Sequence, residues 1–239
     1  CPNRSPFIPR RSPYAHRAEI ALAEVGVPFT RFEIDLSNKP EWYAPKVNPA
    51  SKVPAIAYGG PPVPADQPSP ESTKIAESLV LLELIPDLFP DKSTLVPKDP
   101  ITRAKARFFI EAFSSKFGAP YFAFLHKGEE GAEEKVFEAL EAVQNLKLQE
   151  GKKYAVSDDF TIADAAVLPF FARLEVALGN DLGNYEAGRG KKFVETLKTD
   201  EKYKAFWEYF TLLKERESFK KTFWPEAIVE LYKTRFAKK

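Results

Sequence analysis

Cysteine and histidine are scarce in this sequence, and methionine is absent. The 239 residues include one cysteine, Cys1, and two histidines, His16 and His126. A single cysteine permits no internal disulfide and no cysteine metal cluster. Two histidines leave a histidine-rich metal site out of reach. We therefore expect no metal, and we expect Cys1 to be a bystander because it stands at a chain end.

Neither sign of charge prevails. Lysine and arginine total 35 against 34 for aspartate and glutamate, a net charge of +1. No basic stripe that could follow a phosphate backbone is present, so nucleic acid is not an expected partner. No apolar run is long enough to span a bilayer, and the first residues lack the apolar segment of a signal peptide. These features predict a globular protein of the cytoplasm that does not enter a membrane.

The first helix is predicted to begin within residues 11–17. Ser12 is a preferred N-cap residue, and Pro13 suits the first helical position. Four residues then share one helix face, namely Ala15, Ala18, Leu22 and Val25. Gly26 is expected to end the helix. The start of a helix favours a nearby anion, although these residues alone also fit a capped helix with no further role.

The first ninety or so residues predict a small α/β unit with a poor or edge strand before Ser12, where prolines are frequent. Strands are expected at residues 32–36, 53–58 and 74–76, and a helix from Glu77 through Ile85. Residues 59–70 form a long hairpin loop rich in glycine and proline. A cis peptide bond before Pro54 would turn the backbone of Val53 outward.

Residues 91–100 have the composition of a linker, and everything after them predicts helix. Helical spacing is expected around residues 104–113, 136–143, 165–178, 205–213 and 228–236. Thr161 and Asp164 suggest a capping box, and Pro169 should kink the helix that follows. The predicted domains are residues 1–92, an α/β domain, and residues 100–239, an all-α domain.

Several motifs occur in an order that resembles the glutathione transferases. They are Ser12-Pro13-Tyr14-Ala15-His16-Arg17, Lys39-Pro40-Glu41-Trp42, Asn48-Pro49, Lys52-Val53-Pro54-Ala55-Ile56 and Glu77-Ser78. The resemblance is greatest to the omega class, especially its fungal members. It implies a thioredoxin-like N-terminal domain that binds glutathione, an all-helical C-terminal domain and a homodimer.

The resemblance also implies roles for individual residues. Glu77 and Ser78 would hold the amine and carboxylate of the γ-glutamyl group, as a carboxylate and a hydroxyl at a helix start can do. Val53, before a cis Pro54, would offer its backbone to the cysteinyl part. The alternative is that Glu77 is an ordinary first-turn acid and Ser78 an ordinary cap.

Two lysines and a tyrosine complete the implied glutathione site. Lys39 and Lys52 would meet the glycine carboxylate as point charges, unless they are simple surface lysines. Tyr14 would pack at the pocket wall, whereas His16 points another way on the helix and would be solvent-exposed or structural.

The sequence departs from the omega pattern at Ser12, where members of that class typically carry cysteine. A cysteine there forms a mixed disulfide with glutathione, which a serine cannot do. The Ser12 hydroxyl could instead donate a hydrogen bond to the glutathione sulfur and favour its thiolate. The implied reaction is attack of that thiolate on an electrophile, with hydroperoxide reduction as a side activity.

A second, hydrophobic substrate is expected between the domains. Its candidate wall is Phe108, Phe109, Phe113, Phe117, Tyr121, Phe122, Phe124, Phe171 and Trp224. The alternative for each of these is core packing. An aromatic pocket would suit planar molecules such as plant polyphenols.

Three functional hypotheses remain at this stage. The first is a transferase that uses Ser12. The second is a ligandin that binds glutathione and a hydrophobic guest with little turnover. The third is an interaction module that has kept the fold and lost glutathione.

Overall fold

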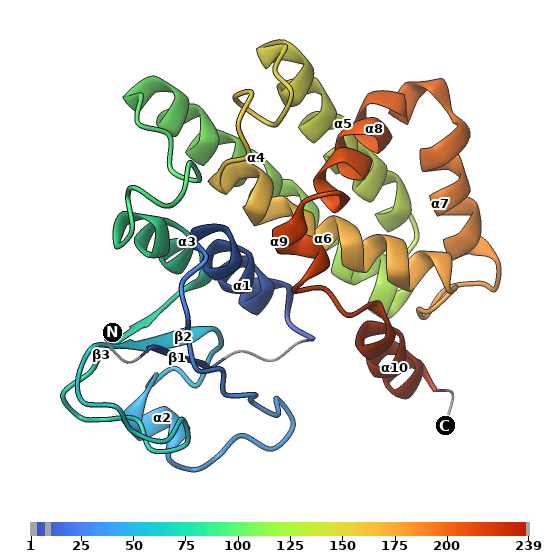
Figure 1. Cartoon of the computed structure of the whole chain (residues 1–239). Coiled ribbons are helices and arrows are strands. Elements are labelled where there is room, and N and C mark those ends of the chain that lie inside the picture. Colours follow the sequence, from blue (N-terminus) through green and yellow to red (C-terminus); the bar gives the residue numbers. More distant parts are fainter. Residues whose placement is uncertain (1–3, 8–10, 238–239) are drawn as a thin grey trace. The chain divides into compact units, whose positions relative to one another are not determined.

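The computed structural model describes residues 4–7 and 11–237, so Cys1 lies outside the described residues (Figure 1). The chain divides into two compact units. The first unit runs to Leu95 and also includes Lys221–Phe223. The second unit comprises Val96–Lys220 and the residues from Trp224 onward.

The described residues of the first unit form a small sheet and three helices. Its strands are β1 (Arg4–Phe7), β2 (Ala55–Tyr58) and β3 (Thr73–Ala76), and its helices are α1 (Pro13–Val25), α2 (Tyr43–Lys46) and α3 (Ser78–Asp87). The strands are antiparallel in the order β1-β2-β3, with Ile56 paired to Ile75. As expected, the proline-rich start supplies an edge strand among the described residues. The loop of residues 59–70 lies within the connection between β2 and β3.

Helix α1 has the ends that its sequence predicts. The Ala15 N–H donates to Ser12 Oγ over 3.2 Å, and Pro13 is the first helical residue. Gly26 takes the left-handed conformation at φ 62°, which glycine adopts at little cost. The predicted apolar face is buried throughout.

The expectation of a strand at residues 32–36 is wrong. Only Phe32 forms an isolated bridge, and the following residues are irregular. Ile34 is nevertheless buried, and it packs with Tyr43 and Val47 of the α2 segment. Leu36 is 44% exposed. The alternating side chains therefore bury one face against α2 without joining the sheet.

The second unit is helical in its described part. Its α-helices are α4 (Pro100–Phe122), α5 (Ala132–Glu150), α6 (Ile162–Gly179), α7 (Arg189–Thr199), α8 (Lys204–Lys214), α9 (Glu217–Lys220) and α10 (Pro225–Phe236). A π-helical segment, η1 (Ala123–Lys127), continues α4, and a short 3₁₀ turn, η2 (Glu201–Tyr203), precedes α8. Helix α7 was missed because lysines and a threonine interrupt its short apolar face of Phe193, Val194 and Leu197.

The predicted capping box at the start of α6 is confirmed. Asp164 is fully buried and accepts hydrogen bonds from the Thr161 N–H at 2.8 Å and the Ala155 N–H at 2.9 Å. The Tyr209 hydroxyl of α8 donates to the same carboxylate over 2.7 Å. Burial raises the pKa of Asp164, while these donors act in the opposite direction. The carboxylate thus joins α6, α8 and the preceding loop.

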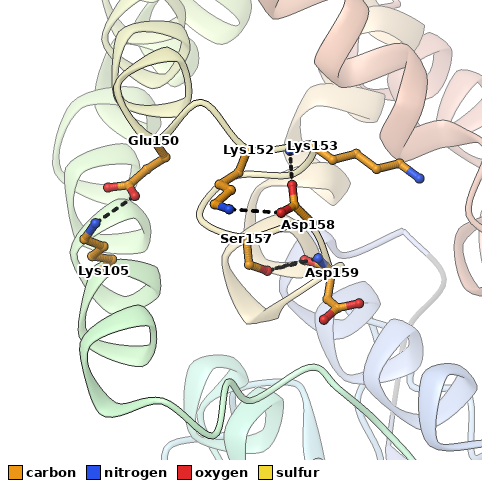
Figure 2. A network of polar contacts seen from close by, with 7 residues as sticks. All are labelled: Lys105, Glu150, Lys152, Lys153, Ser157, Asp158 and Asp159. Carbon is orange, nitrogen blue, oxygen red and sulfur yellow. Dashed lines mark hydrogen bonds and ion pairs between the residues drawn. The ribbon is translucent and has the colours of Figure 1, made fainter.

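The loop before α6 has a second polar network at its surface (Figure 2). Asp158 accepts hydrogen bonds from Lys152 Nζ at 3.0 Å and from the Lys153 N–H at 3.1 Å. At the adjacent end of α5, Glu150 pairs with Lys105 of α4 over 2.8 Å. These contacts are exposed to solvent, where ion pairs contribute little to stability.

Candidate functional site

One cleft of about 510 Å³ in the first unit collects the residues that the sequence singled out. Its lining consists of Ser12, Tyr14, Lys39, Ser51, Lys52, Val53, Pro54, Glu77 and Ser78. We call it the Ser12 cleft. Three separate segments form its walls, namely the start of α1, the loop before β2 and the start of α3, and Lys39 is contributed by a fourth segment before α2.

The first wall is the N-terminal turn of α1. Ser12 is buried, and its oxygen accepts the Ala15 N–H, so a side-chain hydroxyl lies at the positive end of a helix. Tyr14 is 50% exposed and lines the cleft. His16 is structural: it is buried, its Nε2 lies 2.9 Å from Thr222 Oγ1, and its ring stacks on Phe223.

The second wall is the loop that leads into β2. The Lys52 carbonyl oxygen accepts hydrogen bonds from the Tyr43 hydroxyl at 2.7 Å and from Asn48 Nδ2 at 2.8 Å. Tyr43 is fully buried in the core beneath this loop, and its burial raises the pKa of its hydroxyl. The Val53–Pro54 peptide bond is cis, as the sequence suggested. The core therefore fixes the backbone that precedes Val53.

A lysine links this loop to the chain that precedes it. Lys39 Nζ donates to the Ser51 carbonyl oxygen over 2.7 Å, so the side chain spans the cleft wall. Sequence reasoning missed Ser51 as a lining residue. Its backbone is left-handed at φ 52°, which nothing in a serine flanked by alanine and lysine indicates.

The third wall is the start of α3. Glu77 is exposed and has φ 69° with ψ 114°, a conformation that non-glycine residues rarely adopt. Residues held in such conformations cluster at functional sites. Ser78, the first residue of α3, is buried, and its Oγ accepts a hydrogen bond from Arg17 Nη1 over 3.1 Å.

Arg17 belongs to a motif that the sequence analysis recognised, but the sequence predicted no role for it. It is 3% exposed and lies behind Ser78 and Tyr14, with its guanidinium 5.5 Å from the centre of the Tyr14 ring. Burial lowers the pKa of Arg17 to about 10, and the neighbouring Tyr14 acts in the opposite direction. The sequence signal that could have indicated a role for Arg17 was an arginine on a mostly apolar face of α1.

Most candidates for the aromatic substrate wall pack together in the second unit. The buried ones are Phe109, Phe113, Phe117, Phe124 and Phe171. The Phe113 ring centroid lies 4.8 Å from that of Phe117 and 5.4 Å from that of Phe171. This packing accounts for their burial without a ligand.

The remaining aromatic candidates differ in exposure. Phe108 and Phe122 are 63% and 52% exposed. Tyr121 stacks on Phe117 at 5.1 Å, and Trp224 immediately precedes α10. The expectation that this set contacts a second substrate stays a prediction.

Over residues 4–7 and 11–237, no group of three or more His, Cys, Asp or Glu side chains could hold a metal ion. Within the same ranges, no helix has the length and apolar character needed to cross a membrane.

Both units match known families. Residues 11–88 match the glutathione S-transferase N-terminal domain, and residues 110–211 match the glutathione S-transferase C-terminal domain. A probable glutathione S-transferase of Nicotiana tabacum is 36% identical over 213 residues, 87% of this chain and 83% of the relative. The chain belongs to the glutathione transferase family. This family uses glutathione as co-substrate, and the relatives' names support a transferase role.

Solved structures confirm the fold and point to one class. Glutathione transferase Omega 1C from Trametes versicolor is 49% identical with a TM-score of 0.93, and the match covers 100% of this chain and 98% of that one. Omega 2S from the same fungus, in complex with 2,4-dihydroxybenzophenone, is 37% identical with a TM-score of 0.87 over 97% and 98% of the two chains. The predicted thioredoxin-like domain followed by a helical domain is thereby confirmed. Both of these structural relatives are of the omega class.

Proposed function

We propose that this glutathione transferase binds glutathione in the Ser12 cleft and uses Ser12 to stabilise the thiolate of the bound tripeptide. One observation carries the proposal: the residues implied by the family resemblance, scattered from position 12 to position 78, line a single cleft. Chance surface residues of those types would not converge from four chain segments. The expected reaction is transfer of glutathione to an electrophile, with hydroperoxide reduction as a side activity.

The chemistry of the cleft fits the parts of glutathione. The Glu77 carboxylate would pair with the γ-glutamyl ammonium group, and Ser78 at the start of α3 would bind the adjacent carboxylate. The backbone of Val53 would bond to the cysteinyl part in the manner of an added strand, with Pro54 fixing its direction. Lys39, from the segment before α2, and Lys52, in the loop before β2, would meet the glycine carboxylate, and Tyr14 would cover the ligand.

Ser12 would act on the sulfur. A free thiol has a pKa of about 8.5, so only a few per cent is thiolate at neutral pH. A hydroxyl donor together with the positive end of α1 could lower the thiol pKa by about one to two units. Serine forms no disulfide, so conjugation to electrophiles is expected rather than thiol transfer.

The second substrate is proposed to be a planar aromatic molecule. The relative in complex with 2,4-dihydroxybenzophenone supports this class of compound. The aromatic residues of the second unit would supply the hydrophobic surface, with the exposed Phe122 and Phe108 the most accessible. We also propose a homodimer, as the family resemblance implies, and a cytoplasmic location, as the composition predicts.

A ligandin is the second candidate, because the same relative holds an aromatic ligand. The rate of conjugation distinguishes the transferase from the ligandin. Ser12→Ala should lower the rate of conjugation with several electrophiles by about tenfold while glutathione affinity changes less than about twofold. Unchanged rates would favour the ligandin. Failure of the unaltered protein to bind glutathione would contradict both and favour an interaction module.

A further inference from the structure

Arg17 is a buried cation next to the Ser12 cleft. It does not itself line the Ser12 cleft, but Tyr14 and Ser78, which do, lie against its guanidinium. Helix α1 carries Arg17, and Ser78 begins α3, so one hydrogen bond of 3.1 Å connects two walls. A side chain placed in this way could act on a ligand through Ser78.

The chemistry of the two groups fixes the direction of the Ser78 hydroxyl. Arginine is a donor only, so Ser78 Oγ must accept the bond from Arg17 Nη1. A serine hydroxyl carries a single hydrogen, which cannot point back toward that donor. Because Ser78 also lines the cleft, its O–H is left to donate to an acceptor bound there. Arg17 thus makes Ser78 a donor, and a carboxylate is the acceptor that such a donor binds best.

The charge of Arg17 adds to this preference. Burial lowers its pKa to about 10, so the guanidinium remains positive at neutral pH. A positive charge this close to the cleft favours an anion bound there. The side chain of Glu77 makes no capping hydrogen bond to α3, so the first N–H groups of that helix add donors at the same place.

We propose that Arg17 is a positioning residue for the γ-glutamyl carboxylate of glutathione, which it serves by directing the Ser78 hydroxyl and by supplying positive potential behind it. The inference rests on the proposed function, since it needs glutathione in the Ser12 cleft. It predicts that Arg17 affects the binding of one end of the tripeptide and leaves the chemistry at the sulfur unchanged.

The test compares glutathione with γ-aminobutyryl-cysteinylglycine, which lacks only the α-carboxylate. Calorimetry on the whole chain should show that Arg17→Gln weakens glutathione binding by about tenfold, the size expected for a charge-assisted hydrogen bond. Affinity for the analogue should change less than about twofold. Arg17→Lys, which keeps a charged donor, should restore most of the loss. The turnover number at saturating glutathione should stay within about twofold of the unaltered enzyme.

Two further proteins keep the test decisive if Arg17→Gln is poorly folded. Arg173→Gln removes another buried arginine, one that donates to the Pro169 carbonyl, and should leave both affinities unchanged. Ser78→Ala should weaken glutathione binding and make a further Arg17→Lys change nearly silent. Equal losses for glutathione and the analogue, or no loss for either, would overturn the proposal. If the unaltered protein binds no glutathione, the proposed function itself fails; if it binds normally, a negative result concerns Arg17 alone.

Discussion

The ammonium group of Lys39 donates a hydrogen bond to the backbone carbonyl oxygen of Ser51 over 2.7 Å. This contact joins the segment before α2 to the loop before β2, and both residues line the Ser12 cleft. Lys39 therefore has two possible effects on a ligand, since its charge attracts a carboxylate and its hydrogen bond holds the loop in place.

Replacing Lys39 by alanine is expected to raise the dissociation constant of glutathione by about threefold to tenfold. The turnover number at saturating glutathione should change little, because the lysine would bind ground state and transition state alike. Lys46→Ala is the matched control, since Lys46 is exposed on the neighbouring α2 and does not line the cleft. Calorimetry measures both, and equal affinities for the two variants would contradict the assignment.

The buried Asp164 should matter far more for stability than the exposed Asp158. Asp164→Ala would leave the Tyr209 hydroxyl and two backbone N–H groups without their acceptor and is expected to lower the free energy of unfolding by roughly 3 kcal/mol or more. Asp158 is 68% exposed in its ion pair, so Asp158→Ala should cost less than about 1 kcal/mol. Urea unfolding curves compare the two. Similar losses would show that the capping network is not a main support of α6.

His126 should make the protein sensitive to mild acid. Desolvation, helped by the charge of Arg235, lowers the pKa of His126 below its usual 6.5. The unfolded chain therefore takes up this proton at a higher pH than the folded chain does. Stability should fall as the pH drops below about 6.5, until the lower pKa of the folded state is reached.

The comparison uses His126→Phe, which removes the titrating group and keeps an aromatic ring against Phe122 and Phe236. Its melting temperature should fall less than that of the unaltered protein between about pH 7.5 and pH 5.5. Parallel pH profiles for the two proteins would mean that His126 does not contribute to acid sensitivity.

Ser12→Cys is expected to give the protein thiol-transferase activity. A thiolate at the start of α1 can attack glutathione disulfide, forming a mixed disulfide and releasing one glutathione thiolate, so thiol-transferase activity should appear. Peptide mass spectrometry should place the glutathionyl group on residue 12. The unaltered protein is the matched control, because its one thiol, Cys1, is also present in the variant. Absence of both adduct and activity would mean that the sulfur does not lie near residue 12.

The sequence predicted the features of the fold and the site that depend on short-range chemistry. Caps, turn residues and helical spacing act locally, so Ser12, Gly26 and the Thr161–Asp164 capping box were found at their observed places. The lining of the Ser12 cleft was also named almost in full, although only the family resemblance connected its distant segments. Local patterns cannot show which segments meet in space.

The wrong and missing predictions arise because local patterns do not show which segments meet in space. Residues 32–36 alternate as a strand does, but Ile34 buries itself against Tyr43 instead of pairing with β2. Arg17 had no predicted role because its partner Ser78 is far away along the chain. Ser51 was missed because its left-handed backbone is imposed by the surrounding loop and not by its side chain.

The most direct test of the central claim is the pKa of the thiol of bound glutathione, measured from thiolate ultraviolet absorbance across a pH series. In the unaltered protein this pKa should lie about one to two units below the free value, and Ser12→Ala should raise it by about one unit with glutathione still bound. A bound thiol that titrates at the same pH in both proteins would contradict the role given to Ser12.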